Sequence, residues 1–432
     1  MGHHTMAATF LLDVVEAPGG EAKLGSARGE ENVYSNTFSK EMLPGLIKPL
    51  VWSVNIPLVN GAWVRFLTGM TGIQGLRPEE LAKQFYYRAY FNMTALGRVW
   101  ERLGLPQDSL ERLTGVGGPK EGGFKLKPTP KMMAAVPNLM GFLLRHLFLA
   151  DRLESFLPEK MAELRALGRE DLGGLTEEEL MKRVTGLGQA LEDLVYYNVI
   201  TPLASNLFGR RLESKLREAG LDPATIDVLK GVNDVRRYYP NPRLGSLHAS
   251  FLALDPEVQA RVGQQGASAL GGTAPERQFR SQLEGFMEDF GHVSENGNDF
   301  SVAPWREDPG FVLRLIIEHP DPGREAGKMS LEEALPPGNG RSALLSQARR
   351  SRRYALLKEG VSSAYAYGYG LYRNYFMELG RRFASRGLVT APEDVFFLSL
   401  DEVRRIVAGG CAGDAKTTTG SWPCCAGGRW RR

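Results

Sequence analysis

The chain has few cysteines for its length and carries almost no net charge. Its three cysteines, Cys411, Cys424 and Cys425, all lie near the C-terminus. Cys424 and Cys425 are adjacent and lack the ligand spacing of a zinc site. The 53 Lys and Arg residues exceed the 50 Asp and Glu residues by too little to indicate nucleic-acid binding. The composition therefore predicts neither a metal site nor a nucleic-acid partner.

The motifs of common catalytic sites are also missing. The sequence has no Gly-x-x-x-x-Gly-Lys-Ser/Thr phosphate loop, no Gly-x-Gly-x-x-Gly after a strand, no Gly-x-Ser-x-Gly elbow and no His-Glu-x-x-His pair. His248 lies in Ser-Leu-His-Ala-Ser, but no Gly-Gly turn precedes it, so we expect a structural role for it. We expect no cofactor in this chain and no phosphotransferase activity by the chain alone, because nothing in it can cradle the phosphates of ATP.

No apolar segment follows a basic region at the N-terminus, so we expect no secretory signal and predict a cytoplasmic protein. The longest apolar run, 131–150, is interrupted by Pro137 and contains Arg145. A central Arg costs about 2.5 to 3.5 kcal/mol in a bilayer, so we expect a buried helix and no membrane partner. If one face of this helix instead lines a cavity, Met133 and Met140 would suit a bulky apolar ligand.

The periodicity of apolar residues is almost everywhere that of a helix. It predicts a mainly α fold, an irregular multi-helix domain with a few short strands. The clearest helical patterns run from Arg77 to Leu103 and from Ser342 to Arg386, and a short strand is expected at Thr9 to Glu16. Pro44, Pro49 and Pro57 are expected to divide their segment into short helical or extended pieces.

The length of 432 residues suggests about three domains. We expect residues 1–30 to form a linker with a short strand, and residues 31–408 to form one helical domain or two lobes dividing near residue 270. The composition changes near residue 409, where helical periodicity ends and Gly, Thr and Cys dominate. Residues 409–432 are therefore interpreted as a non-native tail from a shifted reading frame or an unrelated junction, or else as a real disordered tail.

The densest polar cluster lies between Gly291 and Pro309. Asn296-Gly297 indicates a turn, and Asp308 followed by Pro309 indicates the start of a helix. The candidate functional side chains of the loop are His292, Asn298, Asp299 and Arg306. They either form a functional site or satisfy the polar backbone of the loop, and the sequence leaves both readings open.

The long pattern from Ser342 to Arg386 has a basic first half and an aromatic second half. Arg349 and Arg353 belong to the basic half. They indicate either a solvated face next to a packed core or an arginine cluster that faces an anion. Near the C-terminus, Ser399 and Glu402 form the pattern of a capping box before one more helix.

Several stretches together resemble the phosphoenolpyruvate-utilising dikinases, a family that includes pyruvate, water dikinase (phosphoenolpyruvate synthase) and rifampicin phosphotransferase. The stretches are Asn36 to Ser53 with Glu41-Met-Leu-Pro-Gly and Pro49-Leu-Val-Trp-Ser, Phe290-Gly-His with Pro304-Trp-Arg-Glu-Asp-Pro, and Glu393-Asp-Val-Phe-Phe-Leu. They keep the family's order and spacing, and the likeness covers roughly residues 31–408.

The resemblance implies a role in phosphoryl transfer. Family members combine an ATP-grasp domain, a helical middle domain that binds the acceptor, and a swivelling domain whose histidine carries the phosphoryl group. This chain resembles the middle domain alone, a fragment whose partners would be those two domains and a small-molecule acceptor, either pyruvate or a rifamycin-like compound. The complete enzyme would use ATP and Mg²⁺ to make AMP, phosphate and the phosphorylated acceptor. The alternative is a free-standing helical binding or scaffold protein without catalysis.

Within this reading, the loop and the basic start of the long helix are expected to form one face of the acceptor site, opposite an apolar wall. His292 is the candidate general base, because histidine has a reference pKa of about 6.5. Arg306, Arg349 and Arg353 are the candidates to meet the phosphate through charge-assisted hydrogen bonds. The family's nucleophilic histidine has no counterpart here, so His292 is not given that role.

Overall fold

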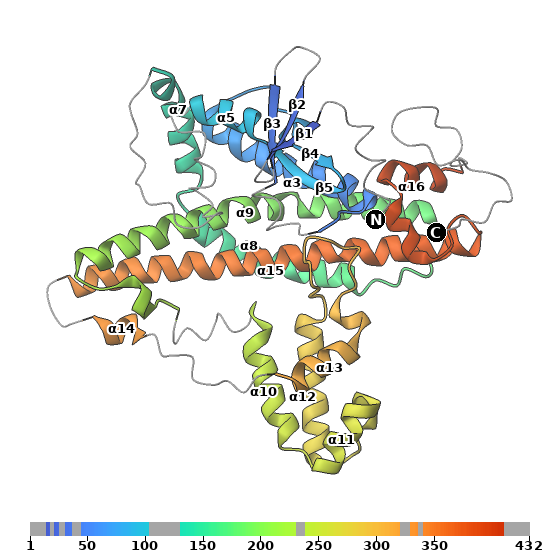
Figure 1. The fold of residues 1–432 in the computed structure, drawn as a ribbon. Coiled ribbons are helices and arrows are strands. Elements are labelled where there is room, and N and C mark those ends of the chain that lie inside the picture. The colour runs from blue at the N-terminus through green and yellow to red at the C-terminus, as the bar shows by residue number, and fades with distance from the viewer. Residues whose placement is uncertain are drawn as a thin grey trace.

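The computed structural model describes residues 14–17, 21–25, 31–36, 45–102, 130–229, 238–319, 329–335 and 340–409. Within these residues the fold is mainly α with a few short strands, as predicted (Figure 1). No single helix in these ranges is both long enough and apolar enough to cross a membrane.

Two long helices, α9 (Glu177–Glu218) and α15 (Arg341–Ser385), lie side by side through the middle of the molecule (Figure 1). The 45 residues of α15 make it about 68 Å long at 1.5 Å per residue. Its predicted span is confirmed to within one residue at each end. The helix α9 begins with a capping box at Thr176, and its interior tolerates Pro202.

Two further helices flank this pair. The helix α8 (Leu149–Gly168) packs against α15, and α3 (Pro49–Thr71) packs against α9. The prediction that prolines divide the α3 segment is wrong, because α3 is continuous through Pro57. Pro49 lies in the first turn, where no backbone hydrogen bond is lost. The burial of Trp63 and other apolar side chains on α3 offsets the hydrogen bond that Pro57 cannot make.

Five short strands form an antiparallel sheet in the order β1-β2-β3-β5-β4. They are β1 (Val14–Ala17), β2 (Glu21–Gly25), β3 (Glu31–Ser35), β4 (Ala82–Phe85) and β5 (Arg88–Asn92). The expected strand at 9–16 is described only from Val14, and β2 lies within the stretch expected to be a linker. A second, parallel pair joins β6 (Ile226–Asp227) to β7 (Met329–Ser330).

The helix expected from Arg77 to Leu103 is not continuous. It is replaced by α4 (Pro78–Leu81), the hairpin of β4 and β5, and α5 (Met93–Arg102). The hairpin turns at Tyr86 and Tyr87, whose φ angles are 51° and 59°. The prediction failed because the aromatic residues favour strand when a partner exists, and β5 finds that partner in the distant β3.

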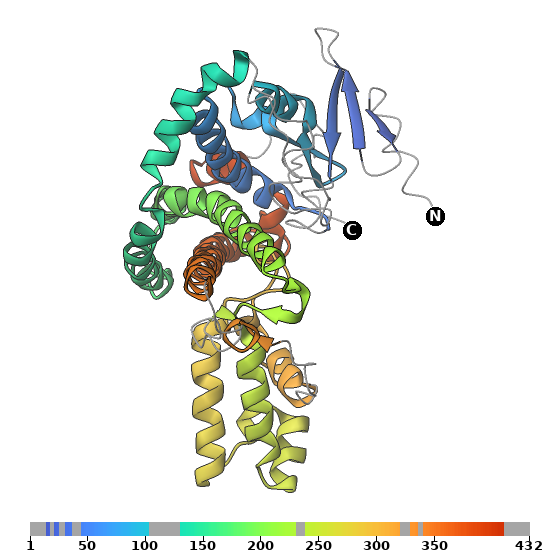
Figure 2. The same cartoon turned by 90° about the vertical axis from the view of Figure 1, so that its left-hand side faces the viewer.

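The main hydrophobic core surrounds α9 and α15, and a separate core lies within residues 244–316. The helices of that second core project from the long pair (Figure 2). The second core is built by α10 (Pro240–Leu252), α11 (Pro256–Gln265), α12 (Ala274–Phe290) and α13 (Pro309–Ile317). We call these helices the lower lobe. The 3₁₀ turn Ala267–Ala269 joins α11 to α12. The division into two lobes near residue 270 stays a prediction.

The apolar stretch after residue 130 is helical but not buried. It forms α7 (Pro130–Arg145), which packs on α3 and α5 through one side only. Met133 is 65% exposed and Met140 is 52% exposed. The expectation of a buried helix is therefore wrong for most of α7, because a uniformly apolar sequence does not reveal how many of its sides find partners.

The remaining elements are short. They are the 3₁₀ helices Pro223–Thr225, Trp305–Glu307 and Pro392–Phe397, and the helices α14 (Leu331–Ala334) and α16 (Leu400–Val407). The helix α16 begins at the capping box of Ser399 and Glu402, as predicted. Residues beyond 409 lie outside the described residues, so the interpretation of the tail stays a prediction.

Candidate functional site

The polar stretch Gly291 to Pro309 is an ordered loop between α12 and α13. Asp308 caps α13, since its side chain accepts a hydrogen bond from the backbone N–H of Phe311 at 2.9 Å. This confirms the predicted helix start at Asp308-Pro309. A side chain at Gly291 would collide with the Met287 carbonyl oxygen, 2.3 Å from an added Cβ, so glycine is required where the chain leaves α12.

Backbone hydrogen bonds close the loop upon itself. The N–H of Trp305 donates to the Val293 carbonyl at 2.8 Å, and the N–H of Arg306 donates to the Gly291 carbonyl at 2.8 Å. At the tip, the Asp299 carboxylate accepts from the N–H of Ser301 at 2.8 Å. Asp299 is only 7% exposed, so its carboxylate serves at least in part to satisfy the backbone of the loop.

A buried arginine on α15 holds the loop in place. Arg373 is 5% exposed, and its guanidinium donates to both carboxylate oxygens of Glu307 at 2.6 and 2.8 Å. It also donates to the Ser301 carbonyl at 2.9 Å. Next to it, Phe300 enters the main core and packs against aromatic rings of α15. The loop is thus fixed to α15 by a bidentate ion pair and a buried ring.

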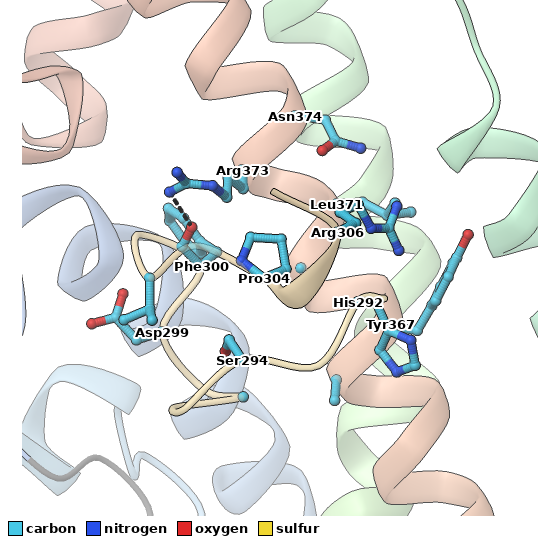
Figure 3. A pocket seen from close by; sticks show the side chains of 14 residues that line it. His292, Ser294, Asp299, Phe300, Pro304, Arg306, Tyr367, Leu371, Arg373 and Asn374 are labelled. Carbon is cyan, nitrogen blue, oxygen red and sulfur yellow. Dashed lines mark hydrogen bonds between the residues drawn. The ribbon is translucent and has the colours of Figure 1, made fainter. Parts of the chain in front are cut away.

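His292 lies at the start of the loop, facing Tyr367 of α15 (Figure 3). The two ring centroids are 5.1 Å apart in an edge-on arrangement. Burial lowers the pKa of His292 to about 4, and the nearby positive charge of Arg306 contributes in the same direction. The ring is therefore neutral at pH 7. Its Nδ1 is buried, and a hydrogen bond between the ring and the backbone of Asp289 opposes part of the lowering of the pKa.

The space between the loop and α15 is too small for an acceptor. Its volume is about 30 Å³, which is room for little more than a water molecule. His292, Asp299 and Arg306 all line it, together with Arg373 (Figure 3). The structure therefore brings these predicted site residues together, but around a small pocket.

A larger cleft of about 590 Å³ lies on the other side of His292. Its walls come from α8, α15 and the lower lobe, and it contains both His292 and Arg353. Apolar wall residues include Leu157, Met161 and Phe290. This volume falls in the range of about 300 to 1,000 Å³ that is typical of small-molecule sites.

The charged side chains of the cleft are arranged as ion pairs. Arg353 donates to Glu154 at 2.6 Å and also pairs with Asp151, and Arg243 pairs with Asp289. Hydrogen bonds to Glu154 and Asp151 raise the pKa of Arg353, so its charge is permanent. An incoming phosphate would have to compete with Glu154 for this guanidinium.

The other predicted site residues lie elsewhere. Arg349 is exposed and lines neither the pocket nor the cleft. Asn298 belongs to the tip of the loop, where its N–H donates to the Asn296 side chain at 3.2 Å. Met133 and Met140 are on α7, which lies at the opposite side of α9 from the loop (Figure 1). The apolar wall of the cleft is thus not the methionine-rich helix.

Sequence reasoning missed several residues of the site. Tyr367 and Arg373 were part of the aromatic half of the long pattern, and Arg243 was part of a proline-rich break. The signal for Arg373 was a single cation among aromatic residues at helical spacing. That signal does not reveal a partner 66 residues away.

The described residues contain no cluster of His, Cys, Asp and Glu side chains suited to a metal ion. A second cavity, of about 750 Å³, lies between α3, α9, α15 and α16. Its lining includes Arg65, Tyr372 and Arg404. Its residues come from both ends of the helical domain.

Comparison with known families covers part of the lining of the cleft beside His292 and none of the second cavity. Residues 198–362 match the family model of the rifampicin phosphotransferase fourth domain. The predicted resemblance to rifampicin phosphotransferase is confirmed over this stretch. It contains the lower lobe, the loop with His292, and Arg353. The cavity of about 750 Å³ is lined entirely by residues outside the match. No curated protein matches the chain.

Proposed function

We propose that the chain is the acceptor-binding part of an ATP-dependent phosphotransferase similar to rifampicin phosphotransferase, and that the acceptor binds in the cleft beside His292. The observation that carries the proposal is the position of this cleft. It is lined by His292, Arg243 and Arg353, which all belong to the stretch that matches the rifampicin phosphotransferase fourth domain. The ATP-grasp and phosphohistidine domains of such an enzyme remain part of the proposal.

The volume of the cleft favours a bulky acceptor. Pyruvate, with three carbons, would fill only a small part of about 590 Å³, whereas a rifamycin-like compound would use the apolar walls as well. The ion pairs along the rim leave the cleft with no strong excess of either charge. We therefore expect a largely apolar acceptor with a hydroxyl group, rather than a small anionic acid.

His292 is suited to orient that hydroxyl. Its neutral ring lines the cleft, and the unprotonated nitrogen of a neutral imidazole can accept a hydrogen bond from the hydroxyl at pH 7. A base with a pKa of about 4 accepts a full proton only weakly, so its main contribution is to hold the reacting oxygen in position. Arg353 can exchange Glu154 for the incoming phosphoryl group.

The test is calorimetric titration of the chain with rifampicin and, separately, with pyruvate. We expect binding of rifampicin and a loss of about tenfold or more in affinity for His292→Gln, the order of one buried hydrogen bond. His319→Gln is the matched control, since His319 belongs to the same lobe but does not line the cleft. Equal affinity of wild type and His292→Gln would place the acceptor elsewhere.

The free-standing scaffold is the competing function. It predicts no small-molecule binding in the cleft and no change when Arg353 is altered. The variant Glu154→Gln discriminates, because it leaves Arg353 without its main partner and should strengthen binding of inorganic phosphate several-fold. If neither the wild type nor Glu154→Gln binds phosphate, the scaffold function is favoured.

A further inference from the structure

The corner between α7 and α8 exposes a continuous apolar surface. Leu144, Leu147 and Phe148 are 64%, 64% and 66% exposed. Leu143, Met140 and Met133 extend the same surface along α7. We call these six side chains the apolar corner. An ordinary protein surface carries exposed apolar residues one at a time, whereas here six large apolar side chains lie next to one another.

The conformation of the apolar corner is fixed from behind. Phe142 packs edge-on against Phe66, with ring centroids 5.7 Å apart. His146 hydrogen-bonds to Tyr196, with Nε2 and Oη 3.0 Å apart. The two helices meet at an angle of 51°, and α7 lies along the outer edge of the molecule (Figure 2). The surface is therefore a rigid protruding ridge, which suits a flat partner better than an inserted ligand.

The charges around the apolar corner are positive. Residues 133–150 include Arg145 but no Asp or Glu. Arg145 and Arg152 donate hydrogen bonds only to the carbonyls of Gly141 and Arg145, and neither has an ion-pair partner among the described residues.

The nearest acidic residues cancel only part of this charge. Asp151 and Glu154, which follow the apolar corner, share the single positive charge of Arg353, so they leave one negative charge against the two positive charges of Arg145 and Arg152. Burial lowers the pKa of His146, and the positive charges of Arg152 and Arg145 lower it further. The charge balance at the apolar corner is thus weakly positive.

We propose that the apolar corner docks the protein reversibly on an anionic lipid bilayer, with the apolar side chains at the level of the headgroups and the arginines among them. Apolar area and attraction to anionic headgroups are the two terms that govern such interfacial binding. A second copy of this chain fits less well, because a twofold contact through the same surface would bring Arg145 and Arg152 toward their own equivalents.

The chain would lie on the bilayer rather than cross it. The helix α8 continues from the apolar corner with Asp151 and Glu154 in its first turns, and these carboxylates stay in water. The expectation of no membrane partner rested on Arg145, which interrupts the apolar run. At an interface the same arginine can extend to the headgroups while its neighbours insert.

The test is co-sedimentation of the full chain with vesicles of phosphatidylcholine alone and of phosphatidylcholine with about a third phosphatidylglycerol. We expect binding to the anionic vesicles only, and weaker binding as the salt concentration rises, because exposed charges are screened. The variant Leu144→Glu should lower the affinity at least about tenfold, since it loses a buried leucine and adds a repelled charge. Arg145→Gln with Arg152→Gln should remove the preference for anionic lipid.

Leu252→Glu is the matched control, because Leu252 is 57% exposed but belongs to the lower lobe. It should bind vesicles like the wild type. The proposal is overturned if the wild type does not bind anionic vesicles. It is also overturned if Leu144→Glu and Leu252→Glu bind them equally well. Sedimentation velocity showing a dimer that Leu144→Glu dissociates, without any vesicle binding, would overturn it too, because the surface would then serve a second copy.

Discussion

Arg373 is the residue on which the position of the candidate site depends most. It is a buried cation, and its hydrogen bonds to side chains and carbonyls all go to the loop. Removing its side chain would leave the Ser301 carbonyl without its partner and would free Glu307 from its bidentate pair. We expect Arg373→Ala to lower the free energy of unfolding by about 3 to 5 kcal/mol, measured by urea denaturation.

Arg381→Ala supplies the comparison, since this arginine of the same helix is 62% exposed and pairs with Glu378 across one turn. Exposed pairs of this kind contribute about 0 to 1 kcal/mol, so little change is expected. A similar loss in both variants would mean that the loop is not held by Arg373 in particular.

His292 should make stability depend on pH. Its pKa is about 4 in the folded chain and about 6.5 when unfolded, so between these values the unfolded state binds more protons. Stability from this group is complete above about pH 6.5 and declines as pH falls toward 4. The total loss is roughly 3 kcal/mol.

Urea denaturation of wild type and His292→Gln at several pH values between 7 and 4 checks the predicted direction of the pH dependence of stability. The difference in unfolding free energy between the two proteins should shrink or reverse as the pH is lowered. NMR titration gives a direct view, because the ring proton of His292 should hold its shift down to about pH 5. A midpoint near 6.5 would show that the ring is solvated.

At the scale of elements, the hairpin of β4 and β5 has an unfavourable turn. Both Tyr86 and Tyr87 have positive φ angles, which Asn and Gly adopt with less strain. The double variant Tyr86→Asn, Tyr87→Gly should raise the free energy of unfolding by about 1 kcal/mol. Thermal and urea unfolding measure it. A destabilised variant would show that the two tyrosine rings, although 41% and 58% exposed, contribute more contacts than the strain costs.

Elements whose signals are local could be predicted from the sequence. Asp308-Pro309 and the capping box at Ser399 specify helix starts through their own side chains, and both were confirmed. The long helix α15 was likewise predicted almost to its ends, because its periodicity extends over many turns. The resemblance that led to rifampicin phosphotransferase also rested on short local motifs.

Features that depend on distant partners could not be predicted. The hairpin at Tyr86 exists because β5 pairs with β3, and the exposure of α7 depends on which neighbours are present on each side. The burial that lowers the pKa of His292 comes from Tyr367 and other groups far away in the sequence. The loop was therefore recognised, but the size and position of its cleft were not.

At the scale of the whole molecule, the lower lobe has its own core and is attached through Phe300. Phe279 is central to the lobe's core, whereas Phe300 belongs to the main core. Phe279→Ala and Phe300→Ala should each lower the free energy of unfolding by about 3 to 5 kcal/mol, the first by weakening the core of the lobe and the second by weakening the main core. Hydrogen exchange should show faster opening of the lobe alone for Phe279→Ala, and of the loop together with its neighbours on α15 for Phe300→Ala. Identical exchange patterns would mean that the two cores unfold as one unit.

The ring of Phe300 also meets Phe396, near the end of the described chain, at a centroid distance of 6.1 Å. Lys48, from the beginning of the helical domain, lies over that same Phe396 ring, and Ser53 accepts a hydrogen bond from the N–H of Leu400 at 2.8 Å. Ribosomes add about 5 to 20 residues per second, so the segment with His292 is made several seconds before Phe396 emerges. During that interval the loop lacks one of its supports, because the ring of Phe396 is not yet there for Phe300 to pack against.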